Sequence, residues 1–138
     1  MGKKLHLLAV PIAAVAVAAL TTLPAQAAEG YDRCLPGNYC MFSGLDGTGD
    51  IIQIDTSTPD LAVLGMAKRA NSDWNRTDQP AYLFSGADYT GCTALSRAGS
   101  KGNFFITYRE FFESVRLGGP GGWSCGKPPG EDAPTSVK

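Results

Sequence analysis

The residues with the most distinctive chemistry in this 138-residue sequence are its four cysteines, Cys34, Cys40, Cys92 and Cys125. An even number of cysteines in a short exported chain is typical of disulfide bonds, and four cysteines allow three pairings. We favour Cys34–Cys40, because Pro36-Gly37-Asn38 can turn tightly between them, with Cys92–Cys125 as the second bond. A zinc site is the alternative, but the sequence has no Cys-x-x-Cys pair to support it.

The side chains that hydrolases use for catalysis are scarce. The only histidine is His6, and we expect it to leave with the signal peptide described below, so no Ser-His-Asp or Cys-His arrangement remains. Glu110 and Glu113 are the only closely spaced glutamates, and three residues apart in a strand their side chains would point to opposite faces. The sequence therefore predicts no enzyme activity, no metal site and no cofactor.

The N-terminus has the features of a secretory signal peptide. Lys3 and Lys4 give a positive start, residues 7–20 are apolar, and Ala25-Gln26-Ala27 supplies small residues for cleavage after Ala27. A membrane anchor is the alternative, but the apolar run is shorter than the roughly 20 residues of a spanning helix, and Pro11 interrupts it. We expect a secreted, extracellular protein that has no membrane contact once the signal is removed.

The charges of the expected mature chain are scattered. Loss of the two N-terminal lysines leaves 10 basic against 13 acidic residues, a formal net charge of −3. Nucleic-acid binding requires basic residues clustered on one face, and no such cluster is visible. We expect a monomer that does not bind nucleic acid.

A nine-residue segment occurs twice, and the two copies lie 42 residues apart. Residues 41–49 and 83–91 are identical at six of nine positions, and the same offset relates Ser72 to Ser114. Such self-similarity indicates a duplicated structural unit.

Short runs of apolar and β-branched residues between Gly- and Asp-rich turns predict an all-β sandwich of two antiparallel sheets. We expect a short helical turn over 59–66. Two phenylalanine pairs, at 104–105 and 111–112, could form a surface patch, but strand alternation predicts one ring of each pair in the core and its neighbour partly covered. The expected strands are 39–43, 51–54, 72–75, 82–85, 92–95, 103–107 and 113–117.

The repeats resemble the Greek-key hairpins of βγ-crystallins, in which an aromatic residue, four others, an aromatic, one residue and glycine follow in order. The second repeat matches this signature completely, and the first has Gly47 in place of the second aromatic. The first ring packs on the folded hairpin, and glycine permits the tight backbone there. In this family a serine near the end of each key hydrogen-bonds the hairpin. The matching residues are Phe42, Gly49, Ser72, Phe84, Tyr89, Gly91 and Ser114.

A narrower resemblance begins at Cys34-Leu35-Pro36-Gly37-Asn38-Tyr39-Cys40. This segment, placed between a signal peptide and a crystallin hairpin, is similar to a secreted actinobacterial peptidase-inhibitor family of the Streptomyces metalloproteinase inhibitor type. Residues 73–77, leading into 82–84, are similar too, and the resemblance covers roughly 34–117. It implies a disulfide-stabilised βγ-crystallin-like sandwich that inhibits thermolysin-like extracellular proteinases through a rigid, substrate-like loop.

The resemblance also implies a site. In the namesake the presented bond follows a cysteine eight residues beyond the hairpin aromatic, which here gives Cys92–Thr93 within the loop 90–97. Two features differ, because the partner cysteine would be the distant Cys125 and because thermolysin-like enzymes prefer a bulky apolar residue after the cut bond. The expected inhibitory residues are Cys92, Thr93, Ala94 and Leu95.

Asp46 and Asp88 occupy equivalent repeat positions, which raises the question of calcium. The crystallin calcium motif begins with two acidic or amide residues, but here Lys68 and Arg109 lie in those windows, and a positive charge opposes a cation. We therefore interpret both aspartates as turn formers that hydrogen-bond their own backbone.

We divide the chain into a signal peptide at 1–27, a βγ-crystallin-like domain at 28–117 and a Gly/Pro-rich extension at 118–138 that Trp123 and Cys125 attach to the body. Two other functions stay open. One is a killer-toxin-like antimicrobial crystallin, and the other is a structural or calcium-binding crystallin of the cell surface.

Overall fold

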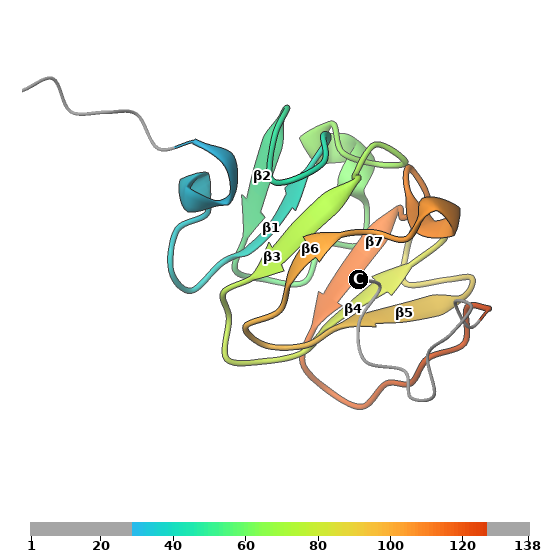
Figure 1. Cartoon of the computed structure of the whole chain (residues 1–138). Helices are drawn as coiled ribbons and strands as arrows, with labels where there is room; N and C mark the ends of the chain where they lie inside the picture. Colours follow the sequence, from blue (N-terminus) through green and yellow to red (C-terminus); the bar gives the residue numbers. More distant parts are fainter. Residues whose placement is uncertain (1–28, 127–138) are drawn as a thin grey trace, which may run out of the picture.

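The computed structural model describes residues 29–126, so the expected signal peptide and the last twelve residues lie outside the described part. Within it, short strands form two antiparallel sheets, with the orders β2-β1-β3-β6 and β5-β4-β7 (Figure 1). No helix of this part is long and apolar enough to cross a membrane. The elements are η1 (Gly30–Arg33), β1 (Tyr39–Phe42), β2 (Ile51–Ile54), η2 (Leu61–Leu64), β3 (Ser72–Asn75), β4 (Ala81–Phe84), β5 (Thr93–Ser96), β6 (Lys101–Asn103), η3 (Ile106–Tyr108) and β7 (Ser114–Leu117).

The sequence repeat is a structural repeat. Strands β4, β5 and β7 begin and end 42 residues after β1, β2 and β3. Each repeat also contributes the segment before its last strand to the sheet of the other repeat. Strand β6 of the second repeat pairs with β3, and Thr58 of the first repeat forms a bridge with Val115 of β7 through hydrogen bonds of 2.7 and 3.0 Å. Neither repeat therefore completes its sheet alone. The prediction of an all-β sandwich of two Greek keys is confirmed.

The predicted strand at 103–107 is wrong. Strand β6 ends at Asn103, and the chain then turns into the 3₁₀ helix η3. The N–H of Phe104 donates to the carbonyl of Asn71 (2.9 Å), and the Phe104 ring is almost fully buried. The aromatic residues that suggested a strand are thus core residues carried by a loop. The short helical turn expected over 59–66 is η2.

The two phenylalanine pairs divide as predicted, but for a different reason. Phe104 and Phe112 are each 1% exposed and meet edge to face at 5.5 Å, whereas Phe105 and Phe111 are partly buried. Neither pair lies in a strand, so loop geometry rather than strand alternation selects the inner ring.

The strand argument about the two glutamates is also wrong. Glu110 has a left-handed backbone, with φ of 54°, and lies in a turn. Glu113 precedes β7 and forms an ion pair with Lys68 at 2.6 Å. The two carboxylates thus belong to a connection between η3 and β7 rather than to two faces of one strand.

Each repeat folds its first hairpin back onto the sheet, and a buried serine holds it there. The Oγ of Ser114 donates to the carbonyl of Gly86 (2.6 Å) and accepts from the N–H of Tyr89 (3.1 Å). Ser72 makes the equivalent bonds, at 2.7 and 3.1 Å, to Gly44 and Gly47. Both serines are fully buried.

Tyr31 supplies the ring that the first hairpin lacks. In the second repeat Phe84 and Tyr89 meet edge to face at 5.6 Å. In the first, Tyr31 from η1 meets Phe42 edge to face at 5.4 Å. A Cβ at Gly47 would come within 2.4 Å of the Tyr31 backbone nitrogen, so glycine there makes room for η1. The departure from the crystallin signature is therefore compensated by a residue outside the repeat.

A buried polar pair lies between β1 and β3. The hydroxyl of Tyr39 donates to Oδ2 of Asp73 at 2.8 Å, and both residues are fully buried. Burial, with the neighbouring Asp73 carboxylate as a second cause, raises the pKa of Tyr39 well above its ordinary value.

We expect Ser114→Ala and Ser72→Ala each to lower the free energy of unfolding by about 1–3 kcal/mol. Either change leaves one N–H and one carbonyl of a folded hairpin without a partner. Urea denaturation measures the loss, and Thr56→Ala, at an exposed position, is a control that should stay within about 0.5 kcal/mol of the parent. A Ser114→Ala protein as stable as the parent would contradict this role.

Stability should fall as the pH rises above about 10, the ordinary pKa of tyrosine. The unfolded chain then loses the Tyr39 proton while the folded chain keeps it, so the unfolded state is favoured increasingly until the folded pKa is reached. Tyr39→Phe should reduce this alkaline slope and, by removing a donor to Asp73, lower stability at neutral pH by about 1–3 kcal/mol. Urea titrations between pH 7 and 11 test both effects, and an unchanged slope in the variant would refute the assignment.

Candidate functional site

The expected inhibitory residues lie at an edge of the second sheet. Strand β5 pairs only with β4, with Thr93 opposite Phe84 and Leu95 opposite Tyr82. Ala94 is fully buried, whereas Thr93 and Leu95 are partly exposed, so these two side chains share the outer face. Half of the expected loop 90–97 is therefore an edge strand, which begins one residue later than the predicted strand.

The C-terminal strap, residues 118–126, covers part of this edge. Both the Ser124 and Cys125 N–H groups donate to the carbonyl of Thr93, at 2.9 and 3.1 Å, and the Thr93 N–H donates to Oγ of Ser124 at 2.8 Å. Trp123 meets Tyr108 edge to face at 5.9 Å. The strap thus binds the main-chain groups of Thr93 without adding a strand to the sheet, and Trp123 and Cys125 attach it to the body.

Two disulfides are present, Cys34–Cys40 and Cys92–Cys125, with Cα–Cα distances of 5.8 and 4.8 Å. No cysteine of the described residues is free. The second bond joins the residue before β5 to the strap, across a sequence separation of 33 residues. It therefore locks the strap against the start of the edge strand.

The Cys92–Thr93 peptide group is held on both sides. The Cys92 carbonyl accepts from the Ser85 N–H at 3.0 Å, on the β4 side. The Thr93 N–H is held by Ser124, on the strap side. A carbonyl in this arrangement points into the hairpin rather than outward, so the bond lies within the sheet and not on a protruding loop.

Leu95 is where the edge of β5 is open. The Ser85–Cys92 bond fixes the ladder, so the N–H and carbonyl groups of Thr93 and Leu95 point away from β4. The strap binds the N–H and carbonyl of Thr93. The N–H and carbonyl of Leu95 have no partner among residues 29–126, which leaves one donor and one acceptor for an incoming strand.

Asp46 and Asp88 do form turns, with φ of 54° and 53°. However, the carboxylate of Asp46 accepts from the side-chain amide of Asn103 at 2.9 Å rather than from its own backbone, which corrects that part of the interpretation. In the described part of the chain, no three His, Cys, Asp or Glu residues lie close enough together to hold a metal ion.

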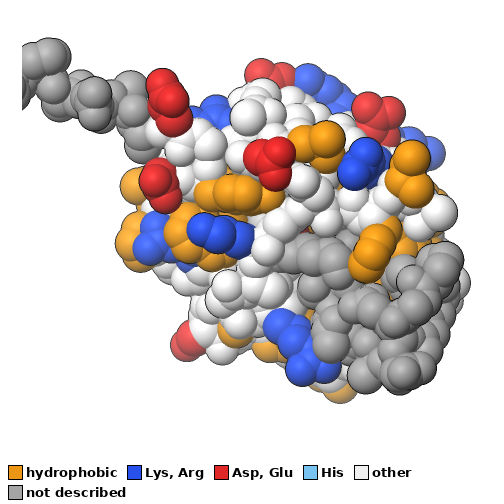
Figure 2. Space-filling view, in the orientation of Figure 1, with side chains coloured by type: hydrophobic (Ala, Val, Ile, Leu, Met, Phe, Trp, Pro, Cys, Tyr) orange, Lys and Arg blue, Asp and Glu red, His pale blue; other side chains and the backbone are white. Residues whose placement is uncertain are grey.

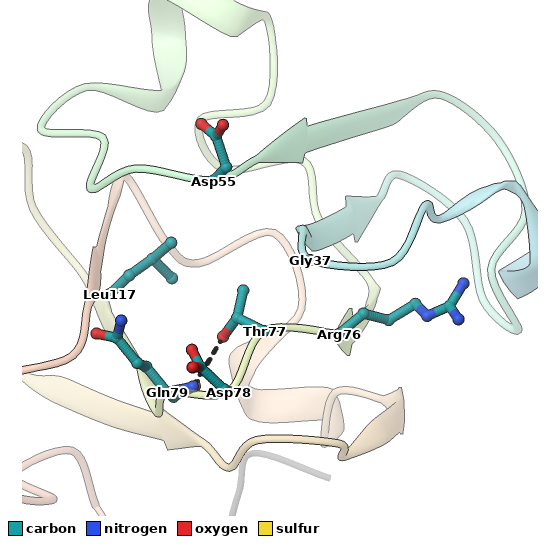
Figure 3. Close-up of a pocket in the computed structure, with 7 residues that line it drawn as sticks. All are labelled: Gly37, Asp55, Arg76, Thr77, Asp78, Gln79 and Leu117. Carbon is teal, nitrogen blue, oxygen red and sulfur yellow. Dashed lines mark hydrogen bonds between the residues drawn. The ribbon is translucent and has the colours of Figure 1, made fainter.

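A hollow of about 370 Å³, which the sequence did not indicate, lies at the junction of the two repeats (Figure 3). It adjoins Leu117, at the opposite end of β4 and β7 from Thr93. Its polar groups are largely used to fix the linker: Arg76 donates to the carbonyl of Cys34 at 2.7 Å, and Thr77 Oγ1 accepts from the Gln79 N–H at 3.2 Å. The lining residues are Gly37, Asp55, Arg76, Thr77, Asp78, Gln79 and Leu117.

Acidic and basic side chains are interspersed on the face that Figure 2 shows. Hydrophobic side chains also reach the surface there, including over the region that η3 occupies in Figure 1. The face therefore offers mixed polar and apolar contacts rather than a field of one sign.

The match to known families bears directly on the edge of β5. The model of peptidase inhibitor family I36 matches residues 27–96, which is half of the chain and includes Cys92–Thr93 and all of β5. The chain belongs to this family. Membership implies a peptidase as the partner of an inhibitor that is not itself an enzyme. No curated protein matches the chain.

Solved structures show the fold. A βγ-crystallin from Ciona intestinalis aligns with a TM-score of 0.54 at 18% identity, over 59% of this chain and 99% of that one. A structure from work on the evolution of the eye lens βγ-crystallin domain fold aligns with a TM-score of 0.55 at 15% identity, over 59% and 85%. A mutant βγ-crystallin domain from Clostridium beijerinckii gives 0.51 at 8% identity, over 58% and 95%. The inhibitor is thus built on a βγ-crystallin scaffold.

Non-reducing peptide mapping should recover the Cys34–Cys40 and Cys92–Cys125 peptides. Replacing Cys92 and Cys125 together by alanine should lower the free energy of unfolding by about 2–4 kcal/mol, because the unfolded chain is then no longer closed across a long loop. Recovery of a Cys40–Cys92 peptide would refute this pairing.

Proposed function

We propose that this protein is a secreted, monomeric inhibitor of thermolysin-like metalloproteinases, which contacts its target through the edge segment Cys92–Leu95. Thr93 and Leu95 supply the partly exposed side chains of this segment, and the buried Ala94 holds it against the core. The observation that carries the proposal is the match to peptidase inhibitor family I36 across these residues. The choice of metalloproteinases rests on the resemblance of the segment 34–40 to the Streptomyces metalloproteinase inhibitor type.

Export is supported by the sequence of the N-terminus and by the disulfides. Residues 1–27 have the composition of a cleavable signal, although they lie outside the described part. Two disulfides suit an oxidising compartment, where they persist. Extracellular peptidases are then the enzymes that the inhibitor meets.

An edge strand suits this role. Peptidases bind their substrates as extended segments, and main-chain hydrogen bonds supply part of the affinity. Strand β5 is already extended, and the open N–H and carbonyl of Leu95 allow pairing without displacement of the strap. Because β4 and the Cys92–Cys125 disulfide fix this segment before binding, little conformational entropy is lost on association.

The same contacts favour survival of the inhibitor. Attack on the Cys92 carbonyl would require loss of its hydrogen bond from Ser85. If the peptide bond were cut, the disulfide and the Ser124 contacts would still hold the new ends in place. A target enzyme would therefore be occupied by a segment that is slow to leave.

Titration of the mature protein against thermolysin-like, subtilisin-like and trypsin-like enzymes should show inhibition of the first class. Thr93→Leu should tighten binding by about 1–3 kcal/mol, since one or two further carbons would fill an apolar pocket. Thr93→Asp should weaken it, while Thr56→Asp, at an exposed threonine of the first repeat, is the matched control. Inhibition of subtilisin alone would refute the metalloproteinase assignment, and inhibition of no enzyme would refute the function.

A further inference from the structure

The C-terminal strap passes from one edge of the second sheet to the other. It leaves β7 at one edge, where the Gly118 N–H donates to the carbonyl of Pro80 at 2.8 Å. It then passes Tyr82 of β4 so closely that a Cβ at Gly121 would come within 2.4 Å of the ring. It ends at β5, the opposite edge, where Cys125 is bonded to the residue before that strand. In Figure 1 it is the red segment that runs from the end of β7 to the start of β5.

Side-chain contacts fix the strap along its length. The Arg116 guanidinium, which lies 5.2 Å from the centroid of the Tyr82 ring, donates to the carbonyl of Pro120. Further along, the ring contact of Trp123 and the disulfide of Cys125 attach the strap to the body. The residue between these two attachments is therefore held in position before any partner binds.

Ser124 is that residue, and it binds both main-chain groups of Thr93. Its Oγ accepts from the Thr93 N–H at 2.8 Å, and its own N–H donates to the Thr93 carbonyl at 2.9 Å. An incoming strand would need these two groups in order to pair at Thr93. The family model matches residues 27–96, so the match does not account for this contact.

We propose that Ser124 is a positioning residue that keeps the segment Cys92–Leu95 an inhibitor rather than a substrate. This inference rests on the function proposed above. Because the strap withholds the main chain of Thr93, a peptidase can pair with this segment only at Leu95. That register is displaced by two residues from the one that would include the Thr93 N–H, which belongs to the Cys92–Thr93 peptide group.

Hydrolysis of the Cys92–Thr93 bond makes demands on the Thr93 nitrogen. Water adds to the Cys92 carbonyl carbon, the carbon–nitrogen bond breaks, and the nitrogen takes up a proton and leaves as an amine. The N–H of this nitrogen donates to Ser124 in the folded protein, so its departure requires loss of that hydrogen bond. Removal of the Ser124 hydroxyl should therefore favour cleavage while the open edge at Leu95 still supports binding.

Ser57 provides a matched control on the same sheet. Its Oγ accepts from the N–H of Leu117 at 3.0 Å, at the end of β7, which is the edge opposite β5. Ser57 and Ser124 are both exposed, and each hydroxyl binds one main-chain N–H of an edge strand. Ser57→Ala therefore removes the same kind of hydrogen bond at the other edge of the sheet.

The test measures two quantities for each variant with a thermolysin-like enzyme. One is the inhibition constant on first mixing, and the other is the rate of cleavage at Cys92–Thr93, followed as the gain of one water in the disulfide-linked protein. Ser124→Ala should be cut about 2- to 10-fold faster than the parent, the change expected for one lost hydrogen bond, with an initial inhibition constant within about threefold. Ser124→Thr, which keeps the hydroxyl, and Ser57→Ala should both be cut at the parent rate.

Gly121→Ala tests the strap without changing Ser124. The added methyl group meets the Tyr82 ring and displaces the strap from β5, so cleavage at Cys92–Thr93 should again be faster than in the parent. Peptide mapping locates the cut, and thermal unfolding establishes that each variant is folded.

The outcomes separate the two proposals. A parent that inhibits no metalloproteinase overturns the proposed function and the role of Ser124 with it. A parent that inhibits, with Ser124→Ala cut no faster, overturns only the role of Ser124. An equal increase in Ser57→Ala also overturns that role, because reduced stability would then explain both variants. Faster cleavage at Cys92–Thr93 in Ser124→Ala and Gly121→Ala alone, with initial inhibition retained, supports it.

Discussion

The folded hairpin held by a buried serine is the contact on which the rest of this structure depends. Ser72 and Ser114 each satisfy two backbone groups of a hairpin that would otherwise extend away from the sheet. Once the hairpin is folded back, its second strand, β2 or β5, lies at a sheet edge. The segment before the last strand of each repeat can then cross to the sheet of the other repeat. The position of β5, and hence of Cys92, follows from this arrangement.

Much of the fold could be predicted because it is duplicated. Residues that recur at an offset of 42 are those whose geometry recurs: the first hairpin ring, the glycine that closes the turn and the serine. The region between β6 and β7 could not be predicted in the same way. Phe104 and Phe105 suggest a strand by composition. The chain instead follows a loop that buries one ring of each phenylalanine pair, Phe104 and Phe112, in the core. The compensation of Gly47 by Tyr31 is likewise a long-range contact that no local pattern signals.

A candidate site could be proposed from the sequence, but its surroundings could not be described from it. The resemblance to the inhibitor family implies Cys92, eight residues beyond Phe84, and the cysteine count suggests its link to the tail. Ser124, whose N–H and hydroxyl groups close the edge at Thr93, lies in a Gly/Pro-rich segment without periodicity, and nothing in its neighbours marks it.

A peptidase inhibitor must present groups that an active site binds while withholding the step that would cleave them. In the segment that we propose for this contact, the Cys92 carbonyl accepts the internal N–H of Ser85. Distortion of this carbonyl toward a tetrahedral state would sacrifice that hydrogen bond, a cost of about 0.5–1.5 kcal/mol, and would also strain a backbone fixed by buried neighbours. The side chain of Thr93 and the open edge at Leu95 remain available for binding. The separation of accessible side chains from protected carbonyls is therefore a physical basis on which this crystallin scaffold can bind a peptidase and remain intact.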